Sequence, residues 1–253
     1  MEFDRINPVT LIAGVASGAG AMAARALALP SQGGLILADR DEAALSAAAD
    51  VLEELRLTPE RVSTLAFDVS NPADWTRAAD FVRGQYGRLD WAVVASAGVE
   101  APAAAPGELV DWGRRPEDLH ATHAALDAIG PLIRANYQGG AIIIAAPAAS
   151  LSLRAPETGL LGLVRAAVEA GTHDAIRVNA IATDGANLPF WKELPWFADV
   201  AGAASDEATL ERLAGKNIPL ARYPAADDVT RLFRMLLAHG NGVTLVVDGG
   251  YTI

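Results

Sequence analysis

The 253-residue sequence contains no cysteine and only two lysines, Lys192 and Lys216. Without thiols the chain can form no disulfide framework, no thiolate nucleophile, no zinc–thiolate site and no iron–sulfur cluster. Acidic residues outnumber basic ones by 31 to 20, and the formal net charge is −11. Such a charge repels the phosphates of a nucleic acid, so we expect no nucleic-acid partner.

Long apolar runs are also lacking. No segment reaches the roughly 18 uninterrupted apolar residues that a membrane-spanning helix needs. The opening residues, MEFDRINPV, carry no basic stretch followed by an apolar run, as a secretory signal would. We therefore expect a cytoplasmic protein without a membrane partner. Because 51% of the residues are hydrophobic, we also expect one globular domain over residues 1–253.

Short apolar runs alternate with longer amphipathic stretches along the chain. The apolar runs are continuous, which is typical of parallel strands covered on both faces. The pattern predicts strands at 9–13, 35–38, 62–67, 91–95, 141–145, 177–182 and 243–247. It predicts helices at 20–29, 41–55, 71–86, 116–135, 158–170 and 225–239. This alternation favours a Rossmann-like, doubly wound α/β fold, with a seven-stranded parallel sheet and helices on both faces.

One stretch, from about 184 to 220, interrupts this rhythm with Pro, Trp and Phe. A long irregular insertion late in such a fold usually covers the ligand crevice. We therefore predict an irregular lid over these residues.

A glycine-rich turn joins the first predicted strand to the first predicted helix. It reads AGVASGAG over residues 13–20 and contains Gly14, Ser17, Gly18 and Gly20. Such glycines let the backbone approach a pyrophosphate at a helix N-terminus. The second predicted strand ends in Asp39, whose carboxylate can accept both hydroxyls of an adenosine ribose. The alternative is that Asp39 is an ordinary solvated carboxylate at a strand end.

Five further motifs follow in order: FDV at 67–69, SAG at 96–98, IRVNAI at 176–181, LARYP at 220–224 and VVDGG at 246–250. Together with the glycine turn, they make the chain resemble the short-chain dehydrogenase/reductase family over essentially its whole length. The resemblance implies that Asp68 and Val69 pack against adenine, and that Ala97 and Gly98 belong to the cofactor site. It implies NAD as cofactor, with NADP less favoured because Asp39 repels a 2′-phosphate. The neighbouring Arg40 argues against this preference, since an Arg there can bind that phosphate.

The sequence does not resemble the family at the catalytic positions. The family's reaction needs a Tyr as proton donor or acceptor, a Lys four residues later and a Ser that steadies the substrate oxygen. The four tyrosines stand at positions 86, 137, 223 and 251, and none is followed by Lys four residues on. The family's register places Leu153 and Glu157 at the Tyr and Lys positions. Pro156 between them disfavours a continuous helix there, because proline inside a helix costs about 3 kcal/mol.

The nicotinamide end departs from the family as well. Where the family carries Pro-Gly and then a carboxamide-binding Thr, this sequence has Thr183, Asp184 and Leu188. The adenosine motifs are therefore retained while those for hydride and proton transfer are lost. We assign no catalytic residue.

Several other side chains could supply substitute chemistry. Candidate acids or bases are Glu100, Asp118, His120 and Glu157. Hydroxyls at Ser150 and Ser152 are better interpreted as turn formers or caps. His120 and His123 have the spacing of two metal ligands on a helix, but no local acidic residue is forced into the position of a third ligand, so we expect no metal site.

Three functions remain open, in this order. The first is a catalytically inactive subunit that keeps NAD binding within a homo- or hetero-oligomeric alcohol/ketone dehydrogenase, beside an active paralogue. The second is an active NAD-dependent oxidoreductase with substituted catalytic residues. The third is a nucleotide-sensing regulator. The family commonly assembles through helices that correspond to 116–135 and 158–170 and through the C-terminal strand. The surplus of small and apolar residues in 158–170 fits a helix that meets a partner.

Overall fold

The computed structural model describes residues 7–16, 18–28, 33–54, 59–95, 116–136, 138–146, 160–171, 175–183 and 201–250. Its strands are β1 (Val9–Ala13), β2 (Gly34–Asp39), β3 (Val62–Ala66), β4 (Trp91–Ala95), β5 (Gly140–Ala146), β6 (Ile176–Thr183) and β7 (Thr244–Val247). Its helices are α1 (Gly18–Leu27), α2 (Glu42–Glu54), α3 (Pro72–Tyr86), α4 (Pro116–Arg134), α5 (Leu160–Gly171), α8 (Asp206–Asn217) and α9 (Ala226–His239), with a short 3₁₀ turn, η1, at Pro59–Arg61. Each predicted strand and helix is present, and its ends differ from the prediction by at most two residues.

The strands form one seven-stranded sheet in the order β3-β2-β1-β4-β5-β6-β7. All six neighbouring pairs are parallel. After β1 the chain adds β2 and β3 on one side of β1. It then adds β4, β5, β6 and β7 in turn on the other side. This confirms the predicted doubly wound, Rossmann-like α/β fold.

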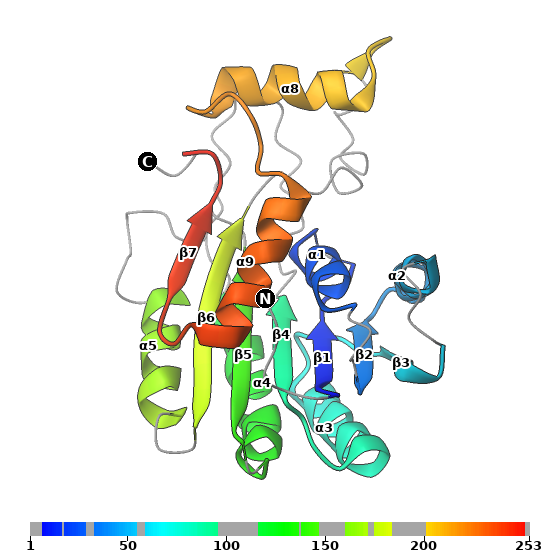
Figure 1. Cartoon of the computed structure of the whole chain (residues 1–253), viewed down its shortest axis with the longest axis vertical. Helices are drawn as coiled ribbons and strands as arrows, with labels where there is room; N and C mark the ends of the chain where they lie inside the picture. Colours follow the sequence, from blue (N-terminus) through cyan, green and yellow to red (C-terminus); the bar gives the residue numbers. More distant parts are fainter. Residues whose placement is uncertain are drawn as a thin grey trace.

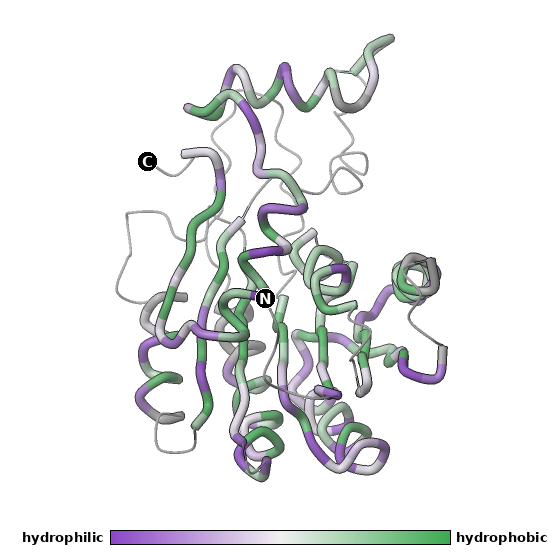
Figure 2. The backbone as a smooth tube through the Cα atoms, viewed as in Figure 1, coloured by the Kyte–Doolittle hydropathy of each residue, from purple (hydrophilic) through white to green (hydrophobic). Residues whose placement is uncertain are grey.

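Helices cover both faces of the sheet (Figure 1). Side chains of α3, α4 and α5 pack on one face, where Trp75 and Ile129 are fully buried. Helices α1, α2 and α9 cover the opposite face, with Phe233 of α9 among the buried residues. Figure 2 shows the resulting pattern, with mostly hydrophobic strands inside and hydrophilic segments on the outer helices.

Burial along the strands follows their place in the sheet. β1, β2, β4 and β5 are buried throughout, and β6 is buried except at Arg177. The edge strands β3 and β7 are only partly buried, so the prediction of full burial is wrong for these two. Each has a neighbouring strand on one side only, and the helices cover an edge less completely than the centre.

The C-terminus of α9 is held by two side chains from β6. Arg177 donates hydrogen bonds to the carbonyls of Leu236 and Gly240 at 3.0 and 2.9 Å. The buried Asn179 donates to the Gly240 carbonyl at 2.8 Å and accepts from the Val243 backbone N–H at 3.1 Å. The last carbonyls of a helix lack partners within the helix, and these side chains supply them. The Arg-Val-Asn motif therefore has a structural role here.

The predicted lid is partly helical. Residues 184–200 lie outside the described part of the chain, but Asp206–Asn217 form the regular helix α8, which lies beyond the end of the sheet toward which β6 and β7 point (Figure 1). The Ser205 side chain caps this helix by accepting from the Ala208 backbone N–H at 3.2 Å. The expectation of an irregular segment over 184–220 is therefore wrong for α8.

The two C-terminal motifs lie against each other. The Leu220 backbone N–H donates to the Gly249 carbonyl at 3.1 Å. Gly249 has φ +69°, and a Cβ there would come within 2.7 Å of the Arg222 carbonyl oxygen, so this contact requires glycine. Within the described residues no helix is both long and apolar enough to span a membrane.

Candidate functional site

The glycine turn lies where the chain direction across the sheet reverses, between β1 and its neighbours β2 and β4. In open α/β sheets this switch point, at the carboxyl ends of the strands, forms the ligand crevice. Gly14 leaves β1 there and donates its backbone N–H to the Ala38 carbonyl of β2 at 2.8 Å.

Gly14 cannot be replaced without strain. Its φ is +83°, and an added Cβ would stand 1.9 Å from the Ala95 carbonyl oxygen at the end of β4. The residue therefore needs both the conformational freedom and the small volume of glycine. The backbone bends sharply over the ends of three strands and leads into α1, whose first turn includes Gly18 and Gly20 and contains no acidic residue. The backbone N–H groups of the first turn of a helix favour an anion.

Asp39 closes the same turn from the side of β2. Its Oδ2 accepts the backbone N–H of Ala16 at 2.8 Å, and its Oδ1 accepts that of Asp41 at 3.1 Å. The residue is only 6% exposed, so it is not the solvated strand-end carboxylate of the alternative interpretation. Each carboxylate oxygen has a second lone pair with which it can accept a further donor, such as a ribose hydroxyl.

The turn after β3 lies beside Asp39. The Phe67 backbone N–H donates to the Asp39 carbonyl at 3.0 Å, and the Asn71 backbone N–H closes the turn by donating to the Asp68 carbonyl at 3.0 Å. Underneath, the Trp75 indole N–H donates to the Val69 carbonyl at 2.8 Å, and its ring packs edge-on against Phe67 at 5.1 Å. The sequence-predicted Asp39, Asp68 and Val69 therefore lie at neighbouring strand ends.

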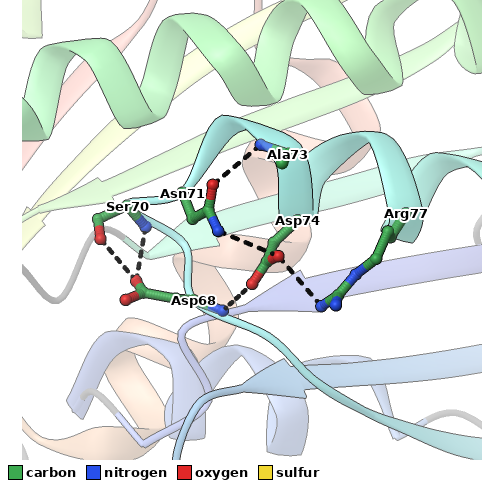
Figure 3. A network of polar contacts seen from close by, with 6 residues as sticks. All are labelled: Asp68, Ser70, Asn71, Ala73, Asp74 and Arg77. Carbon is green, nitrogen blue, oxygen red and sulfur yellow. Dashed lines mark hydrogen bonds and ion pairs between the residues drawn. The ribbon is translucent and has the colours of Figure 1, made fainter.

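The Asp68 carboxylate is oriented by Ser70. Oδ1 accepts the Ser70 hydroxyl at 2.7 Å and the Ser70 backbone N–H at 2.8 Å (Figure 3). These two bonds, the hydroxyl bond first, lower the pKa of Asp68 below the ordinary aspartate value, and Arg40 adds a favourable charge. Asp68 is therefore a fixed carboxylate anion at neutral pH.

Two polar groups of this turn have no partner among the described residues: Oδ2 of Asp68 and the backbone N–H of Val69. One is an acceptor and the other a donor, and they belong to consecutive residues. The edge of a 6-aminopurine offers the complement, because its exocyclic amino group donates and its N1 accepts. This turn can therefore hold adenine.

The remaining predicted cofactor residues, Ser17, Ala97 and Gly98, lie outside the described residues. So do Glu100, Ser150, Ser152, Leu153, Glu157, Asp184 and Leu188. Asp118 and His120 belong to α4, but their side chains are not described, and His123 is exposed on that helix. The described residues contain no group of three His, Cys, Asp or Glu side chains that could hold a metal.

At the opposite end of the crevice, Thr183 ends β6. The residue is 7% exposed, and its Oγ1 is buried without a hydrogen-bond partner among the described residues. A buried hydroxyl without a partner costs about 1–3 kcal/mol. The resemblance implies a Pro at this position, and Thr183 differs from Pro in carrying a hydroxyl group.

The sequence reasoning missed Asp74, which lies in the first turn of α3 and contacts the turn at Asp68 (Figure 3). The signal was available, because an acidic side chain three residues after an Asn cap is the pattern of a capping box. The glycine cradle, the Asp39 carboxylate and the donor–acceptor pair after β3 together fit the pyrophosphate, ribose and adenine of a dinucleotide. The described residues do not include the segments that would face a nicotinamide ring.

Known proteins are similar to this chain over nearly its whole length. Residues 14–252 match the family model described as enoyl-(acyl carrier protein) reductase. The chain is 30% identical to cis-4-hydroxycyclohexanecarboxylate dehydrogenase of Sinomonas cyclohexanicum over 96% of both chains. It is 30% identical to D-threitol dehydrogenase of Mycolicibacterium smegmatis over 100% of this chain and 95% of that relative.

Among solved structures, the fold is similar to that of L-sorbose reductase from Gluconobacter frateurii complexed with NADPH and L-sorbose. The TM-score is 0.76 at 22% identity, over 100% of this chain and 99% of that one. Carveol dehydrogenase from Mycobacterium avium in complex with NAD gives a TM-score of 0.72 at 21% identity, over 99% of both chains.

Proposed function

Because the chain belongs to the short-chain dehydrogenase/reductase family of oxidoreductases, we propose that it binds NAD(H) and, on its own, does not catalyse the family's hydride transfer. One observation carries the proposal. A glycine turn and the residues of the proposed adenosine site are present in a sequence whose 253 residues contain no Tyr followed by Lys four positions later. We therefore expect this chain to bind the cofactor without catalysing hydride transfer on its own.

The described geometry supports the proposed binding. The bend at Gly14 brings the pyrophosphate against the first turn of α1. Asp39, already held by the N–H groups of Ala16 and Asp41, accepts the ribose hydroxyls of NAD and repels the 2′-phosphate of NADP. Asp68 and Val69 receive the adenine edge. Ser17, Gly18, Gly20, Ala97 and Gly98 complete the proposed cofactor site.

The sequence supports the proposed loss of chemistry. Bound nicotinamide supplies a hydride acceptor or donor, but the substrate oxygen still needs a group that donates or accepts a proton. General acid–base groups contribute typically about 10²–10⁴-fold each. The positions of the family's Tyr and Lys hold Leu153 and Glu157, and a leucine cannot exchange a proton.

A non-catalytic subunit needs a partner, so the proposal includes assembly into a homo- or hetero-oligomer, with an active paralogue as one candidate partner. The described surface supports an interface at the sheet edge, whereas an interface at α4 and α5 stays an expectation from the sequence. β7 has a strand neighbour on one side only among the described strands. The two most exposed large hydrophobic residues described, Leu220 at 64% and Val246 at 47%, lie near and on β7. Exposed apolar side chains at a strand edge favour association.

The relatives favour a second candidate. Both relatives compared above are named as dehydrogenases of hydroxylated compounds, and an active enzyme of that class would use substituted groups such as Asp118, His120 or Glu157. The third function, a nucleotide-sensing regulator, shares the binding site and has no observation of its own.

One experiment separates binding from turnover. The purified chain is titrated with NADH by fluorescence and then assayed for NADH oxidation and NAD reduction with cyclic hydroxy acids, polyols and their ketones. The proposal expects saturable binding without turnover. Turnover that disappears in one of the Asp118→Asn, His120→Gln or Glu157→Gln variants would establish the second candidate, and absence of binding would reject both.

A further inference from the structure

Asp74 connects the start of α3 to the turn that precedes it. Its Oδ2 accepts the Asp68 backbone N–H at 3.0 Å, and its Oδ1 accepts from Nδ2 of Asn71 at 3.2 Å. Nη2 of Arg77 lies 3.1 Å from the same Oδ1, and the Asp74 side chain is 14% exposed against 63% for Arg77 (Figure 3). The shielded Asp74 carboxylate therefore bonds mainly to the turn at Asp68, and its ion pair with Arg77 faces solvent.

These bonds leave the turn little freedom. Asp74 holds the backbone of Asp68, Ser70 holds Oδ1 of Asp68, and Trp75 holds the Val69 carbonyl. The two polar groups without partners among the described residues, Oδ2 of Asp68 and the Val69 N–H, are consequently presented in a fixed arrangement. Groups held in advance in their binding geometry lose less freedom when a ligand arrives.

The order of acceptor and donor distinguishes two purines. Adenine presents a donor at its 6-amino group and an acceptor at N1, which matches Oδ2 of Asp68 and the Val69 N–H. Hypoxanthine presents a carbonyl oxygen and N1–H, so that an acceptor meets the carboxylate and a donor meets the N–H. Mismatched polar groups that stay unpaired cause strong rejection.

We propose that Asp74 is a positioning residue that fixes this donor–acceptor pair and so makes the site select an adenine dinucleotide over its hypoxanthine analogue. The inference rests on the proposed NAD(H) binding. Asp74 itself touches no ligand in this account and acts through the backbone of Asp68.

The test compares the dissociation constants of NADH and of reduced nicotinamide hypoxanthine dinucleotide, measured by fluorescence titration. The wild-type chain should prefer NADH by about tenfold or more, which corresponds to roughly one well-placed hydrogen bond. Asp74→Ala should weaken the binding of NADH by about fivefold or more. It should also reduce the preference for NADH over the hypoxanthine dinucleotide to about threefold or less, because a mobile turn adapts to either purine.

Asp80→Ala is the matched control. Asp80 lies on the same helix and forms an exposed ion pair with Arg83 at 2.5 Å, so this variant loses the same charge without touching the turn. Its preference should equal that of the wild type. If Asp74→Ala does not fold, Asp74→Asn serves, since Asn keeps one acceptor and should give an intermediate preference.

Three results would overturn the inference. Affinities for both dinucleotides that stay unchanged in the Asp74 variants would show that Asp74 is not needed to hold the turn. An equal loss of affinity for both dinucleotides would show a merely structural role. Absence of binding of either dinucleotide to the wild-type chain would refute the proposed function and the inference with it.

Discussion

The Asp39→Asn substitution tests the structural role of Asp39 and the cofactor role proposed for it, because it changes charge and acceptor number while preserving shape. The carboxylate accepts the N–H groups of Ala16 and Asp41 at 2.8 and 3.1 Å. Asn has one acceptor oxygen, so one of these two N–H groups must face the amide NH₂ group instead. The substitution therefore removes one hydrogen bond to a charged acceptor and leaves a donor opposite a donor.

The cost to stability can be estimated from that loss. A hydrogen bond to a charged group contributes about 1.5–3 kcal/mol, and the exposure of Ala16 lets water replace part of it. We expect the free energy of unfolding to fall by about 1.5–2 kcal/mol. In a chain of this size that lowers Tm by about 3–8 °C.

The effect on cofactor preference should be larger. A carboxylate beside the ribose disfavours a 2′-phosphate by about 1.5–3 kcal/mol, or roughly 10- to 100-fold in affinity. Asp39→Asn removes the repulsion, and Arg40 stays in place to attract the phosphate. The preference for NADH over NADPH, measured by calorimetric titration, should fall to about threefold or less.

Asp41→Asn is the control for this experiment. The Asp41 carboxylate accepts the N–H groups of Ala43 and Ala44 at 2.9 and 3.0 Å at the start of α2. This variant loses the same charge two residues away, and its cofactor preference should not change. The reasoning would be refuted if the wild-type chain bound NADPH more tightly than NADH. It would also be refuted if Asp39→Asn kept the wild-type preference for NADH over NADPH.

Three further predictions follow from the same features. Purified alone, the chain should show no NAD-dependent turnover on secondary alcohols or ketones; robust turnover would contradict the assignment of a non-catalytic subunit. Light scattering at micromolar concentration should give the mass of at least two chains, and Leu163→Arg in α5 should reduce that mass; a wild-type monomer would leave a non-catalytic subunit without a partner surface. Ser70→Ala should raise the pKa of Asp68 toward its ordinary value, because the hydroxyl bond is the largest cause of its lowering. A lowered folded-state pKa stabilises the protein above the unfolded-state pKa of about 3.9, and this stabilisation is lost as pH falls through the folded-state value. The loss of stability in Ser70→Ala, measured by urea unfolding, should therefore be larger at pH 6 than at pH 3, and equal losses would contradict this role.

The order of strands and helices was predictable because buried parallel strands leave continuous apolar runs. Helix α8 was missed because its apolar residues are few; among its described side chains Thr209, Leu213 and Ala214 are buried. Its start nevertheless carried a signal, since Ser205 precedes two acidic residues, as at many helix N-termini. Prolines and aromatic residues earlier in the segment concealed that signal.

The candidate site was predictable only in part. The spacing of the glycines and of Asp39 predicted ribose and pyrophosphate positions, and the structure brings Gly14 and Asp39 together at one turn. That Asp39 also closes the glycine turn depends on β1 lying beside β2, which places Ala16 at 2.8 Å from Oδ2. Such a contact between residues 23 positions apart follows from tertiary packing, and no local pattern encodes it. The same holds for the contact of Asp39 with the turn after β3.

The central claim is that the chain retains a working dinucleotide site, and a thermal unfolding experiment with NADH tests it most directly. At a ligand concentration 100 times the dissociation constant, binding to the folded state should add about 2.7 kcal/mol to the free energy of unfolding. Gly14→Ala, whose Cβ would stand 1.9 Å from the Ala95 carbonyl oxygen, should lose this stabilisation. An NADH-dependent rise in Tm for the wild type that is absent in Gly14→Ala is the predicted result, and a wild-type chain whose Tm does not respond to NADH would contradict the account.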